Sequence, residues 1–236
     1  MAVQAQEQFT LPIYFDLGAT FLYALTGAVV AVRRHYDIVG LFVIALVSGI
    51  GGGLMRDSIF IQSGPPLAIK DERYLYAVIT GCLAAALFGH RMDRLQKVFL
   101  FADALGLGAY AVVGVSKSLD AGFAVLPAIM IGIINAAGGG LLRDVLVRDE
   151  PLLFKPGQVY VLAALAGAGL FVLFIKEFRW PVETAGLLAV GATFLVRLLA
   201  IVFNWKTTAV DRRLSSYLMT PPPESPDNKD QSSADK

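Results

Sequence analysis

Metal-binding, disulfide-forming and charged residues are all scarce in this chain of 236 residues. The single Cys82 excludes an internal disulfide, and with the two distant histidines His35 and His90 it leaves no plausible transition-metal site. Charged residues make up 17% of the chain and the net charge is +1, so overall charge gives no reason to expect a nucleic-acid partner. The sequence shows no nucleophile–base set either. We therefore predict neither a cofactor nor an enzymatic activity.

Apolar residues dominate the composition, at 56% with a mean hydropathy of +0.63, which is typical of an integral membrane protein. The first twelve residues are polar and lack Lys and Arg, so they do not resemble a cleavable signal peptide. Segments long and apolar enough to span a bilayer lie at roughly 14–32, 38–61, 73–89, 97–116, 123–147, 157–175 and 182–204. The sequence predicts an all-α protein with seven transmembrane helices. The third and sixth, short and rich in Gly and Ala, are predicted to lie inside the bundle.

One short motif occurs twice, as Gly51-Gly52-Gly53-Leu54-Met55-Arg56-Asp57 and as Gly138-Gly139-Gly140-Leu141-Leu142-Arg143-Asp144. Gly lowers helix stability by roughly 1 kcal/mol relative to Ala. Arg or Asp at the centre of a membrane helix costs about 2.5–3.5 kcal/mol. A sequence that accepts both costs twice is expected to use these residues. The alternative is that the glycines only allow close helix packing.

The two motifs belong to a longer repeat with a fixed offset of 87 residues, in which Asp16 maps to Asp103 and Tyr23 to Tyr110. Each repeat contains three helices, and this odd number forces the second copy to enter the membrane from the opposite side. We predict two inverted three-helix repeats plus a seventh helix. The boundaries are an N-terminal segment 1–13, repeats 14–92 and 93–180, a helix 181–205 and a disordered tail 206–236.

Lys and Arg are distributed unequally between the two predicted faces. The loops after the first, third and fifth segments and the stretch after the seventh carry Arg33, Arg34, Arg91, Arg94, Lys97, Arg148, Lys155, Lys206, Arg212 and Arg213. The other face carries Lys70, Arg73, Lys117, Lys176 and Arg179. By the positive-inside rule, this bias places the C-terminus in the cytoplasm and the N-terminus outside a cell inner (plasma) membrane.

The charged pairs of the motif are predicted to need partners on other helices. Adjacent residues point about 100° apart on a helix, so Arg56 and Asp57 are expected to satisfy each other poorly, as are Arg143 and Asp144. Lys117 is expected to snorkel to the outer interface, with a pore-facing position as the alternative.

The inverted topology suggests which carboxylates are those partners. Arg56 lies in the outer half of the membrane, level with Asp16, whereas Arg143 lies in the inner half, level with Asp103 and Asp37. One interpretation is a charge cluster at each mouth of a central pathway. The other is that these acids are helix caps or interfacial residues in contact with water, and for Asp37 we favour this second interpretation. In the first case, we expect the arginines to pair with carboxylates.

Three consecutive glycines also allow a kink or unwound backbone, whose polar groups survive in a membrane only beside water or protein. Broken helices at matching positions of inverted halves indicate a transport site. The predicted pathway residues are Ser48, Gly51, Gly52, Gly53, Arg56, Asp57, Asn135, Gly138, Gly139, Gly140, Arg143 and Asp144, with Asp16, Asp37, Asp103 and Lys117 as supporting charges. Replacing Gly52 or Gly139 with Leu is predicted to abolish transport but to leave insertion and oligomer size nearly intact.

Paired Gly-Gly-Gly-x-x-Arg-Asp motifs in inverted repeats plus a seventh helix resemble the prokaryotic branch of the trimeric intracellular cation (TRIC) channels. This bacterial group is also catalogued as a glycine-transporter-domain family. The resemblance covers residues 14 to about 205. It implies a homotrimer with a pore in each protomer, kinked at both triplets, that conducts monovalent cations, chiefly K+, with Na+ as a second ion. Small residues suit the close helix contacts of an assembly, such as Gly167, Gly169, Gly186 and Gly191.

The residues leave more than one function open. The first is a cation channel with an hourglass pore between the repeats. The second is a carrier for glycine or another small zwitterion, which could bind freed backbone amides and carbonyls. A non-transporting membrane scaffold would leave the intramembrane charges unexplained. The predicted partners are a monovalent cation, further copies of the chain and membrane lipid, without nucleic acid.

Overall fold

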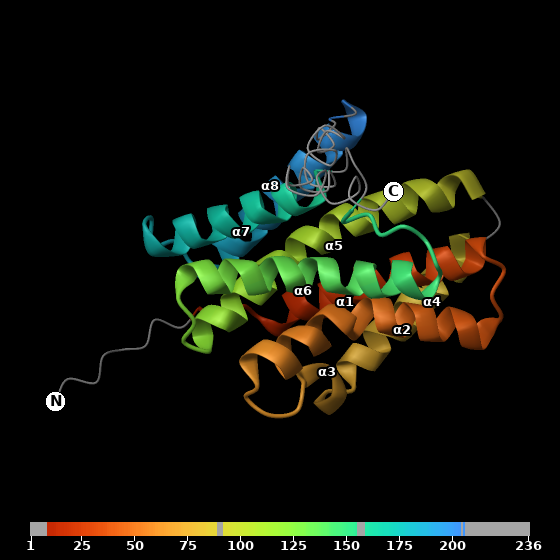
Figure 1. The fold of residues 1–236 in the computed structure, drawn as a ribbon, viewed down its shortest axis with the longest axis horizontal. Coiled ribbons are helices and arrows are strands. Elements are labelled where there is room, and N and C mark those ends of the chain that lie inside the picture. Colours follow the sequence, from red (N-terminus) through yellow and green to blue (C-terminus); the bar gives the residue numbers. More distant parts are fainter. Residues whose placement is uncertain (1–8, 89–91, 155–158, 204, 206–236) are drawn as a thin grey trace, which may run out of the picture.

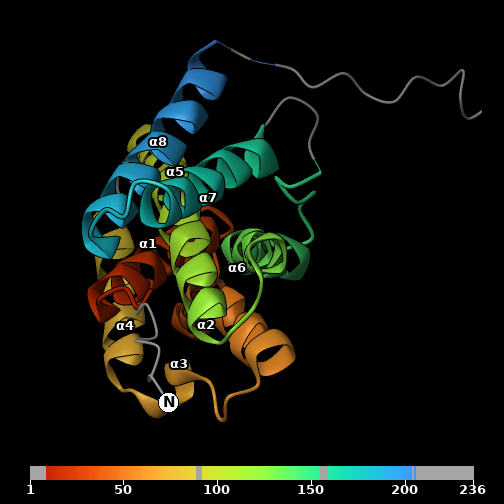
Figure 2. The ribbon, with the colours of Figure 1, turned by 90° about the vertical axis from the view of Figure 1, so that its left-hand side faces the viewer.

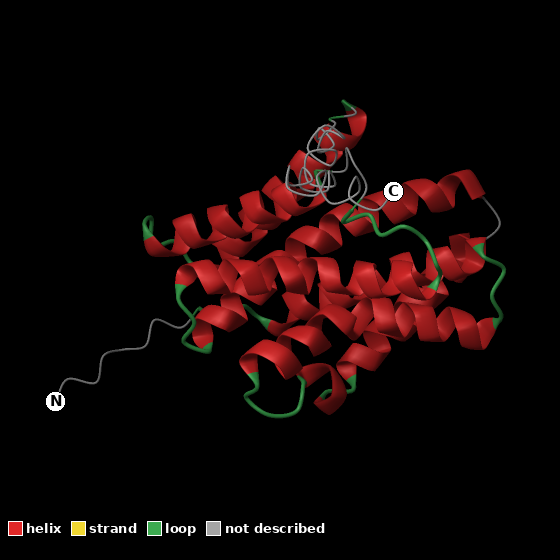
Figure 3. Cartoon of the chain, viewed as in Figure 1, coloured by secondary structure: helices red, strands yellow, loops and turns green. Residues whose placement is uncertain are grey.

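The protein is built from helices throughout the described chain, as Figure 3 shows. The computed structural model describes residues 9–88, 92–154, 159–203 and 205. The helices are α1 (Ile13–Arg33), α2 (Ile38–Met55), the π-helical segment η1 (Arg56–Ile61), α3 (Leu67–Lys70), α4 (Arg73–Phe88), α5 (Met92–Asp120), α6 (Val125–Leu146), α7 (Tyr160–Lys176) and α8 (Val182–Val202). Among these described residues, five stretches are long and apolar enough to cross a membrane: α1, α2 with η1, residues 96–120 of α5, α6 and α8. The predicted all-α membrane class is confirmed.

Each apolar segment predicted from the sequence coincides with a helix, although α4 and α7 are only 16 and 17 residues long. The short α3 and the π-helical η1 were not predicted. The long α5 starts at Met92, before the segment predicted at 97–116. Residues 1–8 of the predicted N-terminal segment, His90 and the predicted tail 206–236 lie outside the described residues.

The helices form a bundle in which α1 and α5 are central. In Figures 1 and 2, α7 and α8 lie along one side, α2 to α4 lie along the other, and α1, α5 and α6 lie between them. The membrane-spanning windows of α1 and α5 are 67% and 72% buried, against 33% for α8. Leu83 and Leu87 of α4 and Leu162 of α7 are exposed on this protomer. The prediction that the third and sixth segments lie inside the bundle is therefore wrong for a single protomer, because each buries only the face that carries its small residues.

Local sequence explains several helix ends. The Asp37 carboxylate accepts a hydrogen bond of 2.7 Å from the Gly40 amide and caps the start of α2. Pro12 and Pro181 directly precede α1 and α8, where a missing amide proton costs nothing. Gly122 follows α5 with φ at +87°, a conformation that glycine adopts without strain. These signals set where the helices that carry the motif and its partners begin and end.

The backbone stays α-helical through both glycine triplets, 51–53 in α2 and 138–140 in α6. The unwound backbone that we considered from the sequence is therefore not present in this conformation. In the first repeat the hydrogen-bonding pattern changes just after the triplet, where η1 begins at Arg56. Such π-helical turns occur frequently at functional sites.

Candidate functional site

The middle glycine of each triplet brings α2 and α6 into backbone contact. A Cβ atom on Gly52 would lie 2.2 Å from the Asn135 carbonyl oxygen, and one on Gly139 would lie 2.2 Å from the Ser48 carbonyl oxygen. These two approaches are related by the 87-residue offset, so both repeats use the same contact. Only hydrogen fits at either position, which favours the packing interpretation for these two glycines. The prediction that Leu at either position leaves the assembly intact conflicts with this geometry, because a backbone carbonyl cannot move aside.

The third glycine of each triplet lies beside the arginine of its own motif. A Cβ on Gly53 would lie 3.7 Å from Arg56 Nη2, and one on Gly140 would lie 3.6 Å from Arg143 Nη2. Both distances are ordinary van der Waals contacts. The third glycine therefore borders the charged site without being required by close packing, and it differs in role from the middle glycine.

Asp16 is the centre of the first cluster, which also contains Arg56, Asp57, Lys117 and Tyr74. Its Oδ2 lies 3.5 Å from Arg56 Nη2 and 2.5 Å from Lys117 Nζ. The Tyr74 hydroxyl donates to the same oxygen at 2.7 Å. Arg56 Nε lies 2.6 Å from Asp57 Oδ1. The predicted pair of Arg56 with Asp16 is confirmed, and Lys117 turns to this carboxylate instead of snorkelling to the interface.

The second cluster contains Asp103, Arg143, Asp144, Arg197 and Thr26. Arg143 Nη1 lies 3.6 Å from Asp103 Oδ1, and Arg197 Nη2 lies 3.6 Å from Asp103 Oδ2. Arg143 Nε lies 2.8 Å from Asp144 Oδ1, and Nη1 donates to the Thr26 hydroxyl at 2.8 Å. The predicted pair of Arg143 with Asp103 is confirmed. Asp37, the alternative partner, instead caps α2 and is exposed.

Each arginine of the motif pairs with the aspartate that follows it, contrary to our prediction. The guanidinium group stands on a long flexible side chain, so Nε can return along the helix to the neighbouring carboxylate although the two Cβ atoms point apart. Each cluster then holds two positive and two negative side chains. Formal neutrality and direct pairing reduce the cost of placing four charges among apolar helices.

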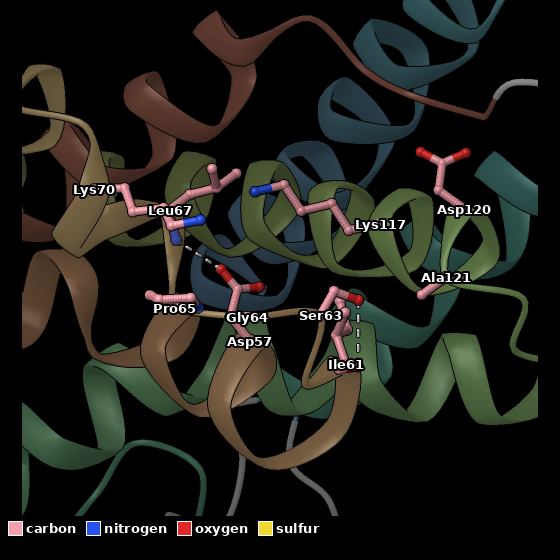
Figure 4. Close-up of a pocket in the computed structure, with 10 residues that line it drawn as sticks. All are labelled: Asp57, Ile61, Ser63, Gly64, Pro65, Leu67, Lys70, Lys117, Asp120 and Ala121. Carbon is pink, nitrogen blue, oxygen red and sulfur yellow. Dashed lines mark hydrogen bonds between the residues drawn. The ribbon is translucent and has the colours of Figure 1, made fainter.

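A cavity of about 360 Å³ opens beside the first cluster, and Figure 4 shows its lining. The amino groups of Lys70 and Lys117 turn toward each other there, above the Asp57 carboxylate. The second cluster is closed: the hollow beside Arg143 and Asp144 leaves no volume for a water-sized sphere. The two clusters thus have the same motif but different access.

Polar side chains continue between the clusters along a line that we call the polar seam, formed by Thr20, Tyr23, Ser48, Tyr110 and Asn135. Ser48 donates to the Tyr23 carbonyl at 2.8 Å, and the equivalent Asn135 donates to the Tyr110 carbonyl at 2.6 Å. The hydroxyls of Thr20 and Tyr110 lie 2.8 Å apart. All five residues are buried. The predicted site residues Ser48 and Asn135 therefore lie in the interior, where they join neighbouring helices.

Sequence reasoning missed several residues of these clusters. Arg197 carried a usable signal, because a charged residue inside an apolar segment is a functional candidate by default. Thr26, Tyr74 and Tyr160 carried none, since hydroxyl-bearing residues are common in membrane helices. Tyr160 joins the polar seam to the second cluster: its hydroxyl lies 2.9 Å from that of Tyr23, and its ring lies 4.8 Å from the Arg197 guanidinium carbon.

Some buried polar atoms in the clusters and the polar seam make no hydrogen bond within the described part of the chain. They are Arg56 Nη1, Arg143 Nη2, Asn135 Oδ1 and both carboxylate oxygens of Asp103. Buried groups of this kind are normally satisfied by ordered water. The same part of the chain contains no group of three or more His, Cys, Asp or Glu residues arranged to hold a metal ion.

Comparison with known sequences places the chain among bacterial membrane proteins. The family model described as Glycine transporter matches residues 13–90 and again 100–176. The UPF0126 membrane protein of Deinococcus radiodurans is 34% identical over 166 residues, which cover 70% of this chain and 77% of that protein. The UPF0126 inner membrane protein YadS of Escherichia coli is 31% identical over 204 residues, covering 85% of this chain and 98% of that protein.

Solved structures show the same architecture. The TRIC trimeric intracellular cation channel orthologue from Rhodobacter sphaeroides superposes with a TM-score of 0.75 at 32% identity, covering 81% of this chain and 97% of that one. A second solved structure, described as the structural basis for conductance through TRIC cation channels, superposes with a TM-score of 0.74 at 26% identity. The match covers 86% of this chain and 98% of that one. The chain is a multi-pass membrane protein of the glycine-transporter-domain family, the prokaryotic branch of the TRIC family that its doubled glycine motif predicted.

Proposed function

We propose that the protein is a monovalent cation channel, chiefly for K+ with Na+ as a second ion, whose pathway runs through each protomer of a homotrimer. The observation that carries the proposal is the buried line of polar groups that joins the first cluster to the second cluster. The similarity to structures described as cation channels supports the same conclusion. A buried polar line inside an apolar helix bundle has a cost that packing alone does not explain.

The proposed topology is inverted, with repeats 14–92 and 93–180 followed by the helix 181–205. The family model matches twice, which supports the internal repeat. If each repeat crosses the membrane three times, the first cluster belongs to the outer face and the second to the cytoplasmic face. The N-terminus is then outside and the C-terminus in the cytoplasm of an inner (plasma) membrane, the compartment that the name of the Escherichia coli relative gives.

The chemistry of the polar seam suits a partly dehydrated monovalent cation. Hydroxyl oxygens of Thr20, Tyr110 and Tyr23 are neutral ligands, and each cluster is formally neutral, so an entering cation meets no bare positive charge. The Arg56 atom without a hydrogen-bond partner favours hydration of the first cluster, where the cavity leaves room for water. We infer that Asp57 and Asp144, the more accessible acids of the two clusters, attract the cation at the mouths.

In this proposal the middle and the third glycine of each triplet have different roles. The middle glycines hold α2 against α6, and the third glycines leave room beside the guanidinium groups. Bending of these two helices at the triplets is the proposed opening movement, because glycine resists bending least. Gly169 and Gly191 are small residues that remain free to contact a neighbouring protomer, since a Cβ atom at either position would have no atom of this chain within 4 Å. Gly167 and Gly186 instead pack against Thr193 and Phe15 of the same protomer.

Purified protein in planar bilayers tests the proposal. Unitary current steps that reverse at the K+ equilibrium potential are the expected result in a KCl gradient. The matched variant Asp57→Asn removes one charge at the mouth and is expected to reduce unitary K+ current at low salt. Crosslinking in detergent is expected to proceed to trimers. The absence of steps from protein that is correctly folded would contradict a channel, and crosslinking that stops at dimers would contradict the trimer.

A carrier for glycine or a similar zwitterion is the second candidate, and the cavity beside the first cluster favours it. Lys70 and Lys117 could bind a carboxylate there, and Asp57 and Asp120 could bind an ammonium group. Proteoliposomes loaded with buffer separate the two functions. Saturable uptake of labelled glycine without unitary current indicates a carrier, whereas K+ current that glycine does not affect indicates a channel.

A further inference from the structure

Two tyrosines lie between the clusters, one on each central helix. On α1, Tyr23 is seven residues, or about two turns, beyond Asp16 of the first cluster. On α5, Tyr110 is seven residues beyond Asp103 of the second cluster and seven before Lys117 of the first. A spacing of seven puts residues on the same helix face. A cation that passes from one cluster to the other along α1 and α5 must pass both rings.

The hydroxyl groups of these tyrosines make crossed contacts that the repeat relates to each other. Tyr23 donates to the Ala136 carbonyl of α6 at 2.5 Å, and Tyr110 donates to the Gly49 carbonyl of α2. Gly49 and Ala136 are equivalent under the 87-residue offset, and each lies two residues before its glycine triplet. Each tyrosine therefore holds the motif helix of the other repeat at the same position.

The rings fill the space where α2 and α6 meet. Their centroids lie 5.3 Å apart, and both residues are buried, at 0% and 1% exposure. A Cβ on Gly139 would lie 3.4 Å from Tyr23 Cδ1, and one on Gly140 would lie 3.5 Å from Cε1. The second triplet thus forms a flat surface that accepts the Tyr23 ring.

We propose that Tyr23 and Tyr110 form the central barrier of the pathway and that their hydroxyl groups hold this barrier closed. The inference deepens the proposed function and depends on it. The rings set the width of the constriction, and the bonds to Ala136 and Gly49 tie it to the helices that carry the triplets. Bending of α2 or α6 at a triplet would break these bonds, so the rings and the helices open together.

Conservative variants separate the hydroxyl groups from the rings. Tyr23→Phe and Tyr110→Phe each remove one bond to a helix carbonyl and keep the ring. Because one hydrogen bond contributes a modest net free energy, each variant is expected to raise the open probability about two- to tenfold at unchanged unitary conductance. Tyr76→Phe is the matched control, since its hydroxyl group bonds Glu72 on the exposed face of α4. It is expected to change nothing.

Removal of the rings tests the barrier itself. The double variant Tyr23→Ala, Tyr110→Ala is expected to pass tetramethylammonium, which the unchanged protein is expected to exclude. The readout is a shift of the reversal potential in a bilayer with K+ on one side and tetramethylammonium on the other. A loss of packing alone would alter expression and not ion size selectivity, so this shift is specific to a constriction.

The outcomes distinguish this inference from the proposed function. If the unchanged protein carries no K+ current, the cation channel is wrong. If it carries K+ current and both Phe variants match Tyr76→Phe, the hydroxyl bonds do not hold a closed state and the inference is wrong, whether or not the Ala variant folds. If the Ala variant folds and conducts but still excludes tetramethylammonium, the constriction lies elsewhere, which also overturns the inference.

Discussion

The two charge clusters carry the same Arg-Asp motif and the same carboxylate from the preceding helix, yet one is open to a cavity and the other is closed. In the first cluster, the side chains of Lys117 and Asp57 are 24% and 13% exposed. In the second cluster, the side chain of Arg197 is only 1% exposed, whereas that of Asp144, the equivalent of Asp57, is 9% exposed, so the second positive side chain makes most of the difference. The closing side chain, Arg197, comes from α8, which has no counterpart in the repeat. A repeated motif can therefore have unequal access when an unrepeated helix covers one copy.

The second cluster is also shielded by aromatic rings. The Arg143 guanidinium carbon lies 4.8 Å from the Phe99 ring centroid, and that of Arg197 lies at the same distance from the Tyr160 ring. Such contacts stabilise a cation that has lost its water. In the conformation described here, Tyr160 of α7 and Arg197 of α8 therefore cover the second cluster.

Leu at a middle glycine should have the largest effect, and it should affect both repeats equally. Gly52→Leu and Gly139→Leu each drive a side chain into a backbone carbonyl 2.2 Å from the position of Cβ. Ordinary overpacking costs about 1–3 kcal/mol, and here we expect a larger cost than for any other change below, because the clash is with backbone that cannot move aside as a side chain can. We expect loss of folded protein, measured as the monodisperse fraction in size-exclusion chromatography. A normal yield of either variant would show that α2 and α6 do not need this contact.

Loss of the central carboxylate, Asp16 or Asp103, should destabilise the protein to a different extent in the two clusters. Asp103→Asn leaves two buried arginines with less compensating charge, which is expected to cost about 3–5 kcal/mol. Asp16→Asn is expected to cost about 1.5–3 kcal/mol, because water from the cavity can reach Lys117. The midpoint of thermal unfolding in detergent measures both. Equal decreases in the unfolding midpoint would show that the carboxylate contributes the same stability in the open cluster as in the closed one.

Removing the positive charge of Lys117 at the cavity should change the K+ conductance, whereas removing the charge of a lysine that does not line the cavity should not. Lys117→Gln is expected to raise unitary K+ conductance about two- to threefold at 0.1 M salt and to have little effect at 1 M, where the Debye length falls to about 3 Å. Lys176→Gln is the control, since that amino group lies against the Phe9 ring and does not line the cavity. The same increase at both salt concentrations would speak against an electrostatic cause.

Ala at the third glycines should have the smallest effect. Gly53→Ala and Gly140→Ala introduce a methyl group in ordinary contact with the guanidinium groups, and Ala is a better helix former by about 1 kcal/mol. We expect thermal stability equal to or slightly above that of the unchanged protein. These variants are also the matched controls for Leu at the middle glycines. A severe loss of folding here would mean that the whole triplet is a packing surface.

The sequence predicted the pairing across helices because repetition and topology restrict it strongly. Asp16 and Asp103 occupy equivalent positions at the level of Arg56 and Arg143, and few other carboxylates are within reach. The positions of the helices could be predicted from the length of the apolar segments. The cap formed by Asp37 followed from its position before an apolar run.

Other features depend on geometry that sequence does not contain. The bond from Arg56 to Asp57 depends on how a long side chain turns back along its helix. The place of Arg197 in the second cluster depends on how α8 crosses α5, because α8 lies outside the repeat. The triplets stay helical because α2 and α6 pack against each other there. The glycine pattern alone was compatible with either packing or unwinding.

The central claim is that the two clusters are the two ends of one transmembrane pathway, and sided thiol labelling tests it most directly. In a Cys82→Ser background, Ser63→Cys marks the exposed rim of the cavity at the first cluster, and Glu150→Cys marks the exposed loop after α6 at the second. A membrane-impermeant maleimide added to intact cells is expected to label Ser63→Cys and to leave Glu150→Cys unlabelled until the membrane is opened. Labelling of both positions from the same side would place both clusters at one face and contradict the account.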